Sequence, residues 1–152
     1  MKIKFPAIII DSREQSQWLF SSISPMPTII TKGLKTGDYS LSGFNDSGIV
    51  VERKSLSDLY GSCGKGRDRL EAEFKRMSKF EYAAIIIERS LGKIVKNPPE
   101  CSRMLPKAVF HTLISWSIKY NVHVWTAEDR IMAEKICYSL FSKFWKYQLE
   151  RI

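Results

Sequence analysis

GIVVERKSLSDL, residues 48–59, joins a short apolar run to three consecutive charged residues. The apolar and β-branched run 49–51 predicts a strand inside a sheet. Ser55, followed three residues later by Asp58, resembles a capping box and predicts that a helix starts there. Burying unpaired charge is costly, so the Glu-Arg-Lys triplet at 52–54 needs a specific explanation.

Apolar runs and turn signals predict the remaining elements on both sides of this stretch. The Asn-, Asp- and Gly-rich segment 44–48 predicts a turn of the hairpin type. Residues 14–20 could form one or two helical turns, and 91–102, which contains two prolines, is expected to be a basic loop. Strands are predicted at 5–11, 27–33, 36–43, 48–54, 82–89 and 122–125. Helices are predicted at 67–80 and 106–120. A final helix, capped by Thr126 and Asp129, is expected to run to about Leu149. Strands first and then helix–strand–helix indicate an α/β or mixed α+β domain with a central sheet.

The composition fits one globular domain over residues 1–152, with 44% hydrophobic residues. Lysine and arginine total 24 against 16 acidic residues, giving a net charge of +8. Such an excess favours a polyanionic partner, either nucleic acid or an anionic membrane surface, although it could also serve only solubility.

The cysteines and the amino-terminal segment limit where the protein could work. Cys63, Cys101 and Cys137 are widely spaced without a Cys-x-x-Cys pair, which predicts neither disulfides nor zinc and favours a reducing compartment. The apolar run of residues 5–10 ends at Asp11 and is too short for a secretory signal. We therefore expect a protein of the cytoplasm, nucleoid or nucleus, not secreted and without a membrane span.

A functional site at the edge of the sheet would explain why a buried strand ends in three charged residues. Residues i and i+2 of a strand share a face, so Glu52 and Lys54 project to one side and Arg53 to the other. Asp38 begins the adjacent strand of the hairpin and can lie beside Glu52. Asp11 ends the first strand and can reach the same edge if that strand is a neighbour.

Crowded carboxylates repel one another, and a divalent cation is the usual relief. Oxygen ligands that leave coordination positions open select Mg²⁺ or Mn²⁺ over zinc. The backbone carbonyl of Arg53 could add a third protein oxygen, and Lys54 could orient a water or offset developing charge. The alternative is a solvated strand end in which the charged triplet pairs with Asp58.

Gly-Asp at 37–38, Glu-Arg-Lys at 52–54 and Asp58 stand in the order of the motif Gly-Asp-x(n)-Glu-Arg-Lys-x-x-x-Asp. In this motif the chain resembles the nuclease domain of the XPF family of structure-specific DNA endonucleases. IIIDSRE (8–14), GRDRLEAEFKRM (66–77) and AAIIIER (83–89) resemble further segments of that family, so the resemblance covers about residues 6–147.

The resemblance implies a restriction-endonuclease-like α/β fold, a central mixed sheet flanked by helices on both faces. It also implies a Mg²⁺- or Mn²⁺-dependent endonuclease that cuts branched DNA, such as flaps, forks or junctions, in repair or recombination. Asp38 and Glu52 would be metal ligands and Lys54 the water-positioning lysine. By the same resemblance Asp11 and Asp58 would be supporting acids, which stand in the outer metal shell or hold the basic side chains.

Other positions follow the resemblance less closely. Arg53 would be structural or directed at phosphate, and Arg13 and Glu14 match the family with Glu14 the weaker assignment. The family usually carries Gln where this helix has Glu71 or Glu73. Many members also carry a helix–hairpin–helix or helicase domain, and we expect neither here, because helix–hairpin–helix turns need glycine and the last glycine is Gly92.

Two further surfaces are predicted. Basic residues of the loop 61–66, of the helix 67–80 and near Asp11 could contact DNA phosphates, although the loop could be a simple helix break and three acids dilute the helix. The wide apolar stripe of the final helix predicts a homodimer or heterodimer contact. The DNA-contacting residues would be Arg13, Lys65, Arg67, Arg69, Lys75 and Arg76, and the dimer residues Leu140, Phe141, Phe144 and Trp145.

Two alternative functions remain open from the sequence. A non-catalytic DNA-binding subunit could dimerise with an active nuclease and only position the DNA. A restriction-type nuclease would share the chemistry but cut intact duplex at defined sequences.

Overall fold

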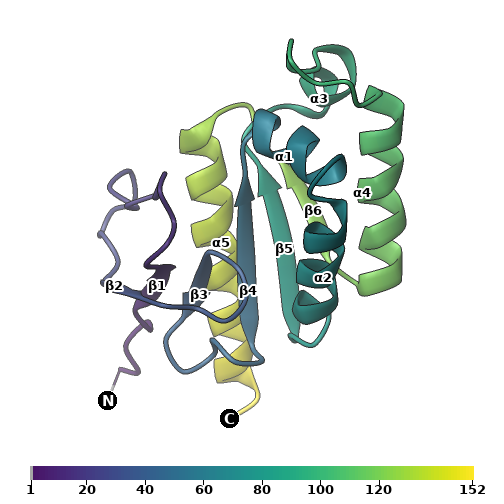
Figure 1. Ribbon diagram of the computed structural model, residues 1–152. Helices are drawn as coiled ribbons and strands as arrows, with labels where there is room; N and C mark the ends of the chain where they lie inside the picture. Colours follow the sequence, from purple (N-terminus) through teal and green to yellow (C-terminus); the bar gives the residue numbers. More distant parts are fainter. Residues whose placement is uncertain (1) are drawn as a thin grey trace.

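The computed structural model describes residues 2–152 and contains one mixed sheet with helices on both faces (Figure 1). The elements are β1 (Ile8–Asp11), β2 (Ile29–Lys32), β3 (Tyr39–Leu41), β4 (Ile49–Lys54), α1 (Leu56–Cys63), α2 (Arg67–Met77), β5 (Tyr82–Ile87), α3 (Leu91–Lys96), α4 (Pro106–Tyr120), β6 (His123–Thr126) and α5 (Arg130–Glu150). The predicted α/β architecture with a central mixed sheet is therefore confirmed.

The direction of the strands decides where the functional residues meet. The six strands have the order β2-β1-β3-β4-β5-β6. β3 is antiparallel to both β1 and β4, whereas β4, β5 and β6 are parallel. The carboxyl ends of β1 and β4 therefore lie at the same edge of the sheet as the amino end of β3.

Alternating side chains of β4 supply two separate hydrophobic cores. Val50 packs with α1, α2 and α4 on one face of the sheet. Ile49 and Val51 pack on the other face with α5 and with the segment that carries Trp18 and Phe20. This alternation is the ordinary consequence of the pleat, and it fixes which side of the sheet Glu52 and Lys54 occupy.

The segment between β1 and β2 differs from the one or two helical turns considered possible for 14–20, since it is irregular. Trp18 and Phe20 are nevertheless completely covered, at 1% and 0% exposure. Phe20 adopts a left-handed backbone, with φ 58, and its N–H donates to the Glu134 carboxylate of α5 at 2.9 Å. The segment is therefore held by the burial of two aromatic rings and by the hydrogen bond to Glu134, and not by helical hydrogen bonds.

The expected loop 91–102 begins instead with the short helix α3, so that prediction was wrong for its first half. Ser90 caps α3 by accepting from the Lys93 N–H at 3.3 Å, and Ile94 is buried. The two prolines come after the helix, at positions where they only prevent its continuation.

The amino-terminal cap of α5 also differs from the prediction. Asp129, rather than Thr126, is the N-cap residue and accepts from the Met132 N–H at 2.8 Å. Thr126 instead ends β6. Within residues 2–152, α5 is the longest helix at 21 residues, and no helix there is both long and apolar enough to cross a lipid bilayer.

Candidate active site

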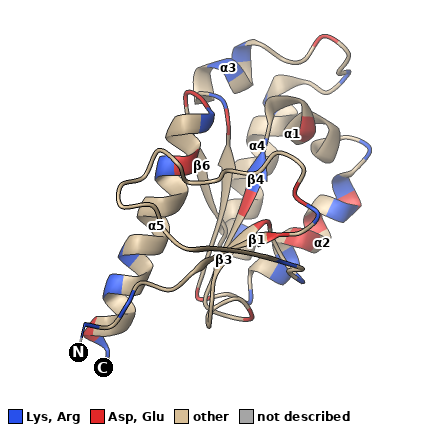
Figure 2. Cartoon of the chain, turned by 90° about the vertical axis from the view of Figure 1, so that its left-hand side faces the viewer, with Lys and Arg blue, Asp and Glu red and all other residues tan. Residues whose placement is uncertain are grey.

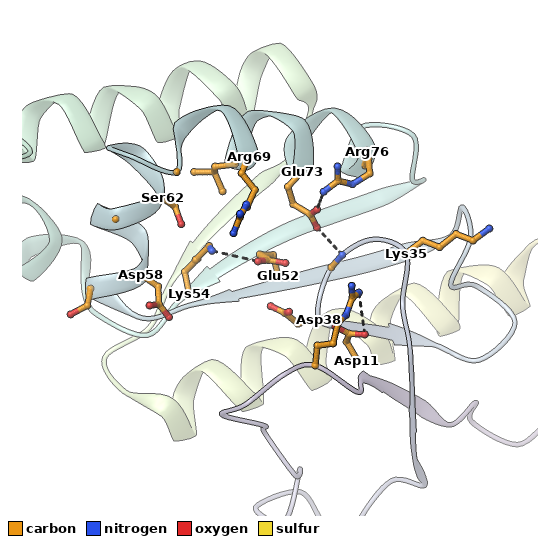
Figure 3. A pocket seen from close by; sticks show the side chains of 16 residues that line it. Asp11, Lys35, Asp38, Glu52, Lys54, Asp58, Ser62, Arg69, Glu73 and Arg76 are labelled. Carbon is orange, nitrogen blue, oxygen red and sulfur yellow. Dashed lines mark hydrogen bonds and ion pairs between the residues drawn. The ribbon is translucent and has the colours of Figure 1, made fainter.

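The end of β4 presents its charged residues on the two faces that strand geometry predicts. Glu52 and Lys54 point together into a cleft beside α2 (Figure 3), with 3.6 Å between Lys54 Nζ and Glu52 Oε1. Their side chains are only 14% and 17% exposed. A carboxylate and an ammonium are thus held together in a partly dehydrated setting.

Asp38 is brought to the same cleft by backbone hydrogen bonds around it. Its N–H donates to the Val51 carbonyl at 2.9 Å, and its own carbonyl accepts from the Asp11 N–H at 2.8 Å. The Arg53 N–H donates to Asp38 Oδ2 at 2.8 Å. The predicted convergence of the first, third and fourth strands at one edge is therefore observed.

Gly37 allows the chain to turn into this position. Its φ is +74, and a Cβ atom there would collide with Val50 Cγ2 and lie 3.2 Å from the Val51 carbonyl oxygen. The Gly37 N–H donates to Glu73 Oε1 of α2 at 2.8 Å. Glycine is required because the turn combines a left-handed backbone with a close approach to β4.

Burial and nearby negative charge make the two central carboxylates hard to ionise. Burial, with a smaller contribution from Glu14, raises the pKa of Asp38 to about 6. Burial and the neighbouring Asp38 also raise the pKa of Glu52 well above its ordinary value, while Lys54 opposes the rise. Perturbed pairs of this kind are characteristic of catalytic and metal-binding sites.

The cleft has a volume of about 500 Å³. Figure 2 shows acidic residues gathered where β1, β4 and α2 meet, with basic residues around them. The charged residues that line the cleft are Asp11, Asp38, Glu52, Asp58 and Glu73 together with Arg13, Lys35, Lys54, Arg69 and Arg76. An acidic centre with a basic rim suits a metal ion and a phosphate held side by side.

The two supporting acids occupy different environments. The Asp11 carboxylate is buried and already engaged, since it accepts from the Leu34 N–H at 2.9 Å and pairs with Arg13 at 3.1 Å. Asp58 is exposed on α1 and points toward the cleft (Figure 3). Asp58 thus lies exposed at the rim of the cleft, whereas Asp11 is held by contacts at the edge of the sheet.

Arg53 lies on the opposite face, within a chain of buried ion pairs. Its guanidinium contacts Glu14 Oε2 at 3.0 Å and Glu88 Oε1 at 2.5 Å. Glu88 also accepts from Trp18 Nε1 at 3.0 Å and pairs with Arg130 of α5 at 3.3 Å. Arg53 is therefore structural through its side chain, while its N–H orients Asp38.

The predicted DNA-contacting residues separate into three groups. Arg13, Arg69 and Arg76 line the cleft, and Lys65 lines an adjoining one. Arg67 turns away, because it stacks over Trp116 at 4.7 Å and donates to Thr112 at 2.9 Å. Lys75 is exposed on α2 and lines neither cleft.

The four residues predicted for a dimer contact also differ in how much of their side chain is exposed to solvent. Phe141 is completely buried in the core of this chain, and Phe144 is 9% exposed. Leu140 and Trp145 are partly exposed on α5. Only these two present substantial surface beyond the core.

Sequence reasoning assigned no role to two acids that make specific contacts around the site. Glu73 lines the cleft, pairs with Arg76 and holds the turn before Asp38. Glu88 directly follows the apolar strand β5, and the same pattern of an acid after a buried strand marked Glu52. That pattern could have identified Glu88, whereas Glu73 has no signal besides its helical spacing.

The donor atoms of the site fit a hard divalent cation, although only two carboxylates are arranged for it. Within residues 2–152 no three side chains of His, Cys, Asp or Glu are grouped as ready-made metal ligands. Asp38 and Glu52 nevertheless offer carboxylate oxygens to the cleft, and burial, with a smaller contribution from nearby negative charge, raises the pKa of both. Two carboxylates with open positions are typical of Mg²⁺ sites, which retain several waters.

Comparison with known proteins agrees with this geometry. The family model described as the ERCC4 domain matches residues 10–140. The solved structure of XPF from Aeropyrum pernix is similar, with a TM-score of 0.71 and 25% identity over 90% of this chain and 60% of that chain. XPF from Aeropyrum pernix in complex with DNA is similar at a TM-score of 0.72 and 25% identity, over 93% of this chain and 66% of that one.

The chain spans about 60–66% of the length of these two solved chains. Comparison with individually curated proteins gives no match. The family match covers most of the chain, and the resemblance expected from the Gly-Asp and Glu-Arg-Lys segments is confirmed. This chain belongs to the ERCC4 domain family, and its fold is that of the XPF nuclease domain.

Proposed function

We propose that this chain is a divalent-metal-dependent endonuclease that hydrolyses phosphodiester bonds in branched DNA. The observation that carries the proposal is the pair Asp38 and Glu52, two carboxylates with raised pKa values beside Lys54 in a cleft with a basic rim. Membership of the ERCC4 domain family supports it.

Each residue of the site has a specific part in this chemistry. Mg²⁺ or Mn²⁺ held by Asp38, Glu52 and the Arg53 carbonyl would supply Lewis-acid polarisation of the scissile phosphate. Lys54 can donate to the attacking water or to a phosphate oxygen, which offsets negative charge in the transition state. The Arg53 N–H keeps the Asp38 carboxylate in one orientation, and the buried pairs with Glu14 and Glu88 hold Arg53.

DNA is the proposed substrate because the rim of the cleft is basic and one similar protein was solved in complex with DNA. Backbone phosphates would supply most of the affinity, so binding should weaken steeply with salt. A role in repair or recombination, in the cytoplasm, nucleoid or nucleus, is part of the same proposal.

We also propose that the chain works as a dimer through α5. Two adjoining clefts of about 380 and 310 Å³ share Leu140 and Lys143 on this helix. Trp125 and Tyr147, which line them, are 42% and 53% exposed. Exposed aromatic residues around apolar clefts are typical of protein interfaces.

Cleavage of end-labelled flap, fork, four-way junction and plain duplex DNA tests the catalytic proposal. Wild type, Asp38→Asn, Glu52→Ala and the control Asp46→Asn, which changes an exposed loop acid, are compared in Mn²⁺, Mg²⁺ and EDTA. We expect metal-dependent cleavage near the branch that falls at least about 100-fold in the two site variants, since each removes a proposed metal ligand. The control should cut like wild type.

Two results would contradict the proposal in different ways. Binding without cleavage under every condition would make the chain a DNA-positioning subunit. Cleavage of plain duplex at defined sequences would make it a restriction-type nuclease.

A further inference from the structure

A second cleft adjoins the proposed active site across the turn between α1 and α2. Its volume is about 640 Å³, and it shares Gly61 with the active-site cleft. One wall is formed by the end of α1 and the turn that follows it, up to Lys65, and the other by residues 101–104 of the segment that precedes α4. The two clefts are therefore neighbours along the surface.

The walls of this second cleft are held together by specific contacts. Met104 is partly buried against the core, and a Cβ atom on Gly64 would lie 3.2 Å from Met104 Cγ. Ser102 Oγ accepts from the Met104 N–H at 3.2 Å. Tyr60, at the base of the cleft, donates its hydroxyl to the Ile94 carbonyl of α3 at 2.6 Å. The cleft is thus a built feature of the fold.

Its chemistry combines an apolar floor with a basic rim. Met104 is partly exposed and supplies apolar surface, Tyr60 lines the floor but is only 1% exposed, and Lys65 and Arg103 are both exposed. None of the residues that line the cleft is acidic. Gly61, where the two clefts meet, has no atom within 4 Å of the position a Cβ would take, so a ligand can approach the backbone closely.

We infer that this cleft binds the sugar–phosphate backbone of one unpaired DNA strand next to the site of cleavage. The inference rests on the proposed function and adds the substrate feature that the site would recognise. Because the two clefts meet at Gly61, a strand that leaves the active site would pass into the second cleft. There it would lie between Lys65 and Arg103. Proteins that bind single strands use positively charged grooves that follow the backbone, and this cleft carries a basic side chain on each of its walls.

An exposed thiol in the cleft permits a direct test by chemical protection. Cys101 lines the cleft and is exposed, whereas Cys63 and Cys137 are buried. The rate of alkylation of Cys101 by iodoacetamide is measured in EDTA, with saturating forked DNA or with saturating blunt duplex of the same length. We expect forked DNA to slow alkylation at least about 5-fold and blunt duplex to leave the rate nearly unchanged, because only an unpaired strand enters the cleft.

A matched pair of charge variants provides the second measurement. Lys65→Gln/Arg103→Gln is compared with Lys2→Gln/Lys4→Gln, which removes the same charge at the opposite end of the molecule from α3 (Figure 1). For forked DNA the cleft variant should bind about 10-fold more weakly. The slope of log affinity against log salt should become shallower by about 1.4, since each phosphate contact to a single strand contributes about 0.7. Its affinity for blunt duplex should match that of the control variant.

The inference is overturned if Cys101 reacts equally fast in the saturated forked complex. It is also overturned if the cleft variant keeps the wild-type ratio of fork to duplex affinity. Protection of Cys101 in a protein that never cuts DNA would uphold the strand-binding cleft and remove only the proposed nuclease function.

Discussion

Asp38 is held where its negative charge is unfavourable, so its titration should affect stability when no metal is bound. The pKa of Asp38 is about 6 in the folded chain against an ordinary value of 3.8. The folded state therefore binds the proton more tightly, and the free energy of unfolding falls as pH rises from about 4 to about 6. Above that range the carboxylate is ionised and the stabilisation is lost.

Asp38→Asn should consequently stabilise the metal-free domain, although it removes a residue of the proposed site. An amide can still accept from the Arg53 N–H while carrying no charge. At pH 7.5 in EDTA we expect the free energy of unfolding to rise by about 1–3 kcal/mol, and the gain to approach zero near pH 4. Urea denaturation at both pH values measures this.

The control for that measurement is Asp46→Asn, which changes an exposed carboxylate and should have little effect at either pH. Adding Mn²⁺ should stabilise wild type and not Asp38→Asn, because binding to the folded state alone raises stability. A variant less stable than wild type at pH 7.5 in EDTA would contradict the prediction.

At the scale of elements, Glu88 connects three parts of the fold around the end of β5. Its carboxylate contacts Arg53 of β4, Arg130 of α5 and Trp18 of the irregular segment. Removing one member of a buried ion-pair network leaves its partners uncompensated. We expect Glu88→Ala to lower the free energy of unfolding by about 3–5 kcal/mol.

Glu128→Ala is the matched control, because Glu128 is an exposed acid close to the start of α5. It should change stability by less than about 0.5 kcal/mol in the same urea titration. An equal effect of the two variants would mean that the network contributes nothing to the fold. Glu88→Gln should fall between them, since it keeps the shape and removes the charge.

The same elements show what the sequence could predict. The strand β4 and its alternation were predictable because a β-branched run ended in charges whose spacing assigns faces. Asp38 was expected at that edge because it begins the adjacent strand of the hairpin. Asp11 was expected there on the assumption that the first strand is a neighbour in the sheet. The helix α4 begins at Pro106 as predicted, because proline is favoured in the first helical turn.

Other features depend on contacts distant in sequence, which local patterns do not contain. The segment around Trp18 is fixed by bonds to Glu88 and Glu134 rather than by helical propensity. The position of Glu73 beside Gly37 results from the packing of α2 against the edge of the sheet. The turning of Arg67 toward Trp116 likewise depends on α4.

At the scale of the whole molecule, one face lies apart from the proposed active site and from the strand-binding cleft. It is formed by the outer side of α5 and the adjacent edge of the sheet. Leu140 lies between the two clefts there, and basic side chains such as Lys143 surround the apolar centre. On β5 and β6, Tyr82 and His123 stack with 4.5 Å between ring centroids. A stable interface buries about 800 Å² on each partner, and we expect this face to form its centre.

We expect light scattering after gel filtration to give twice the chain mass of 17.6 kDa at concentrations of tens of micromolar. Leu140→Glu should yield the monomer mass, because a carboxylate at the centre of an apolar interface would be desolvated without a partner. Ile118→Glu, at a position that is 79% exposed on α4, is the matched control and should remain dimeric. A wild-type chain that stays monomeric, or two variants that behave alike, would place the partner contact elsewhere than on α5.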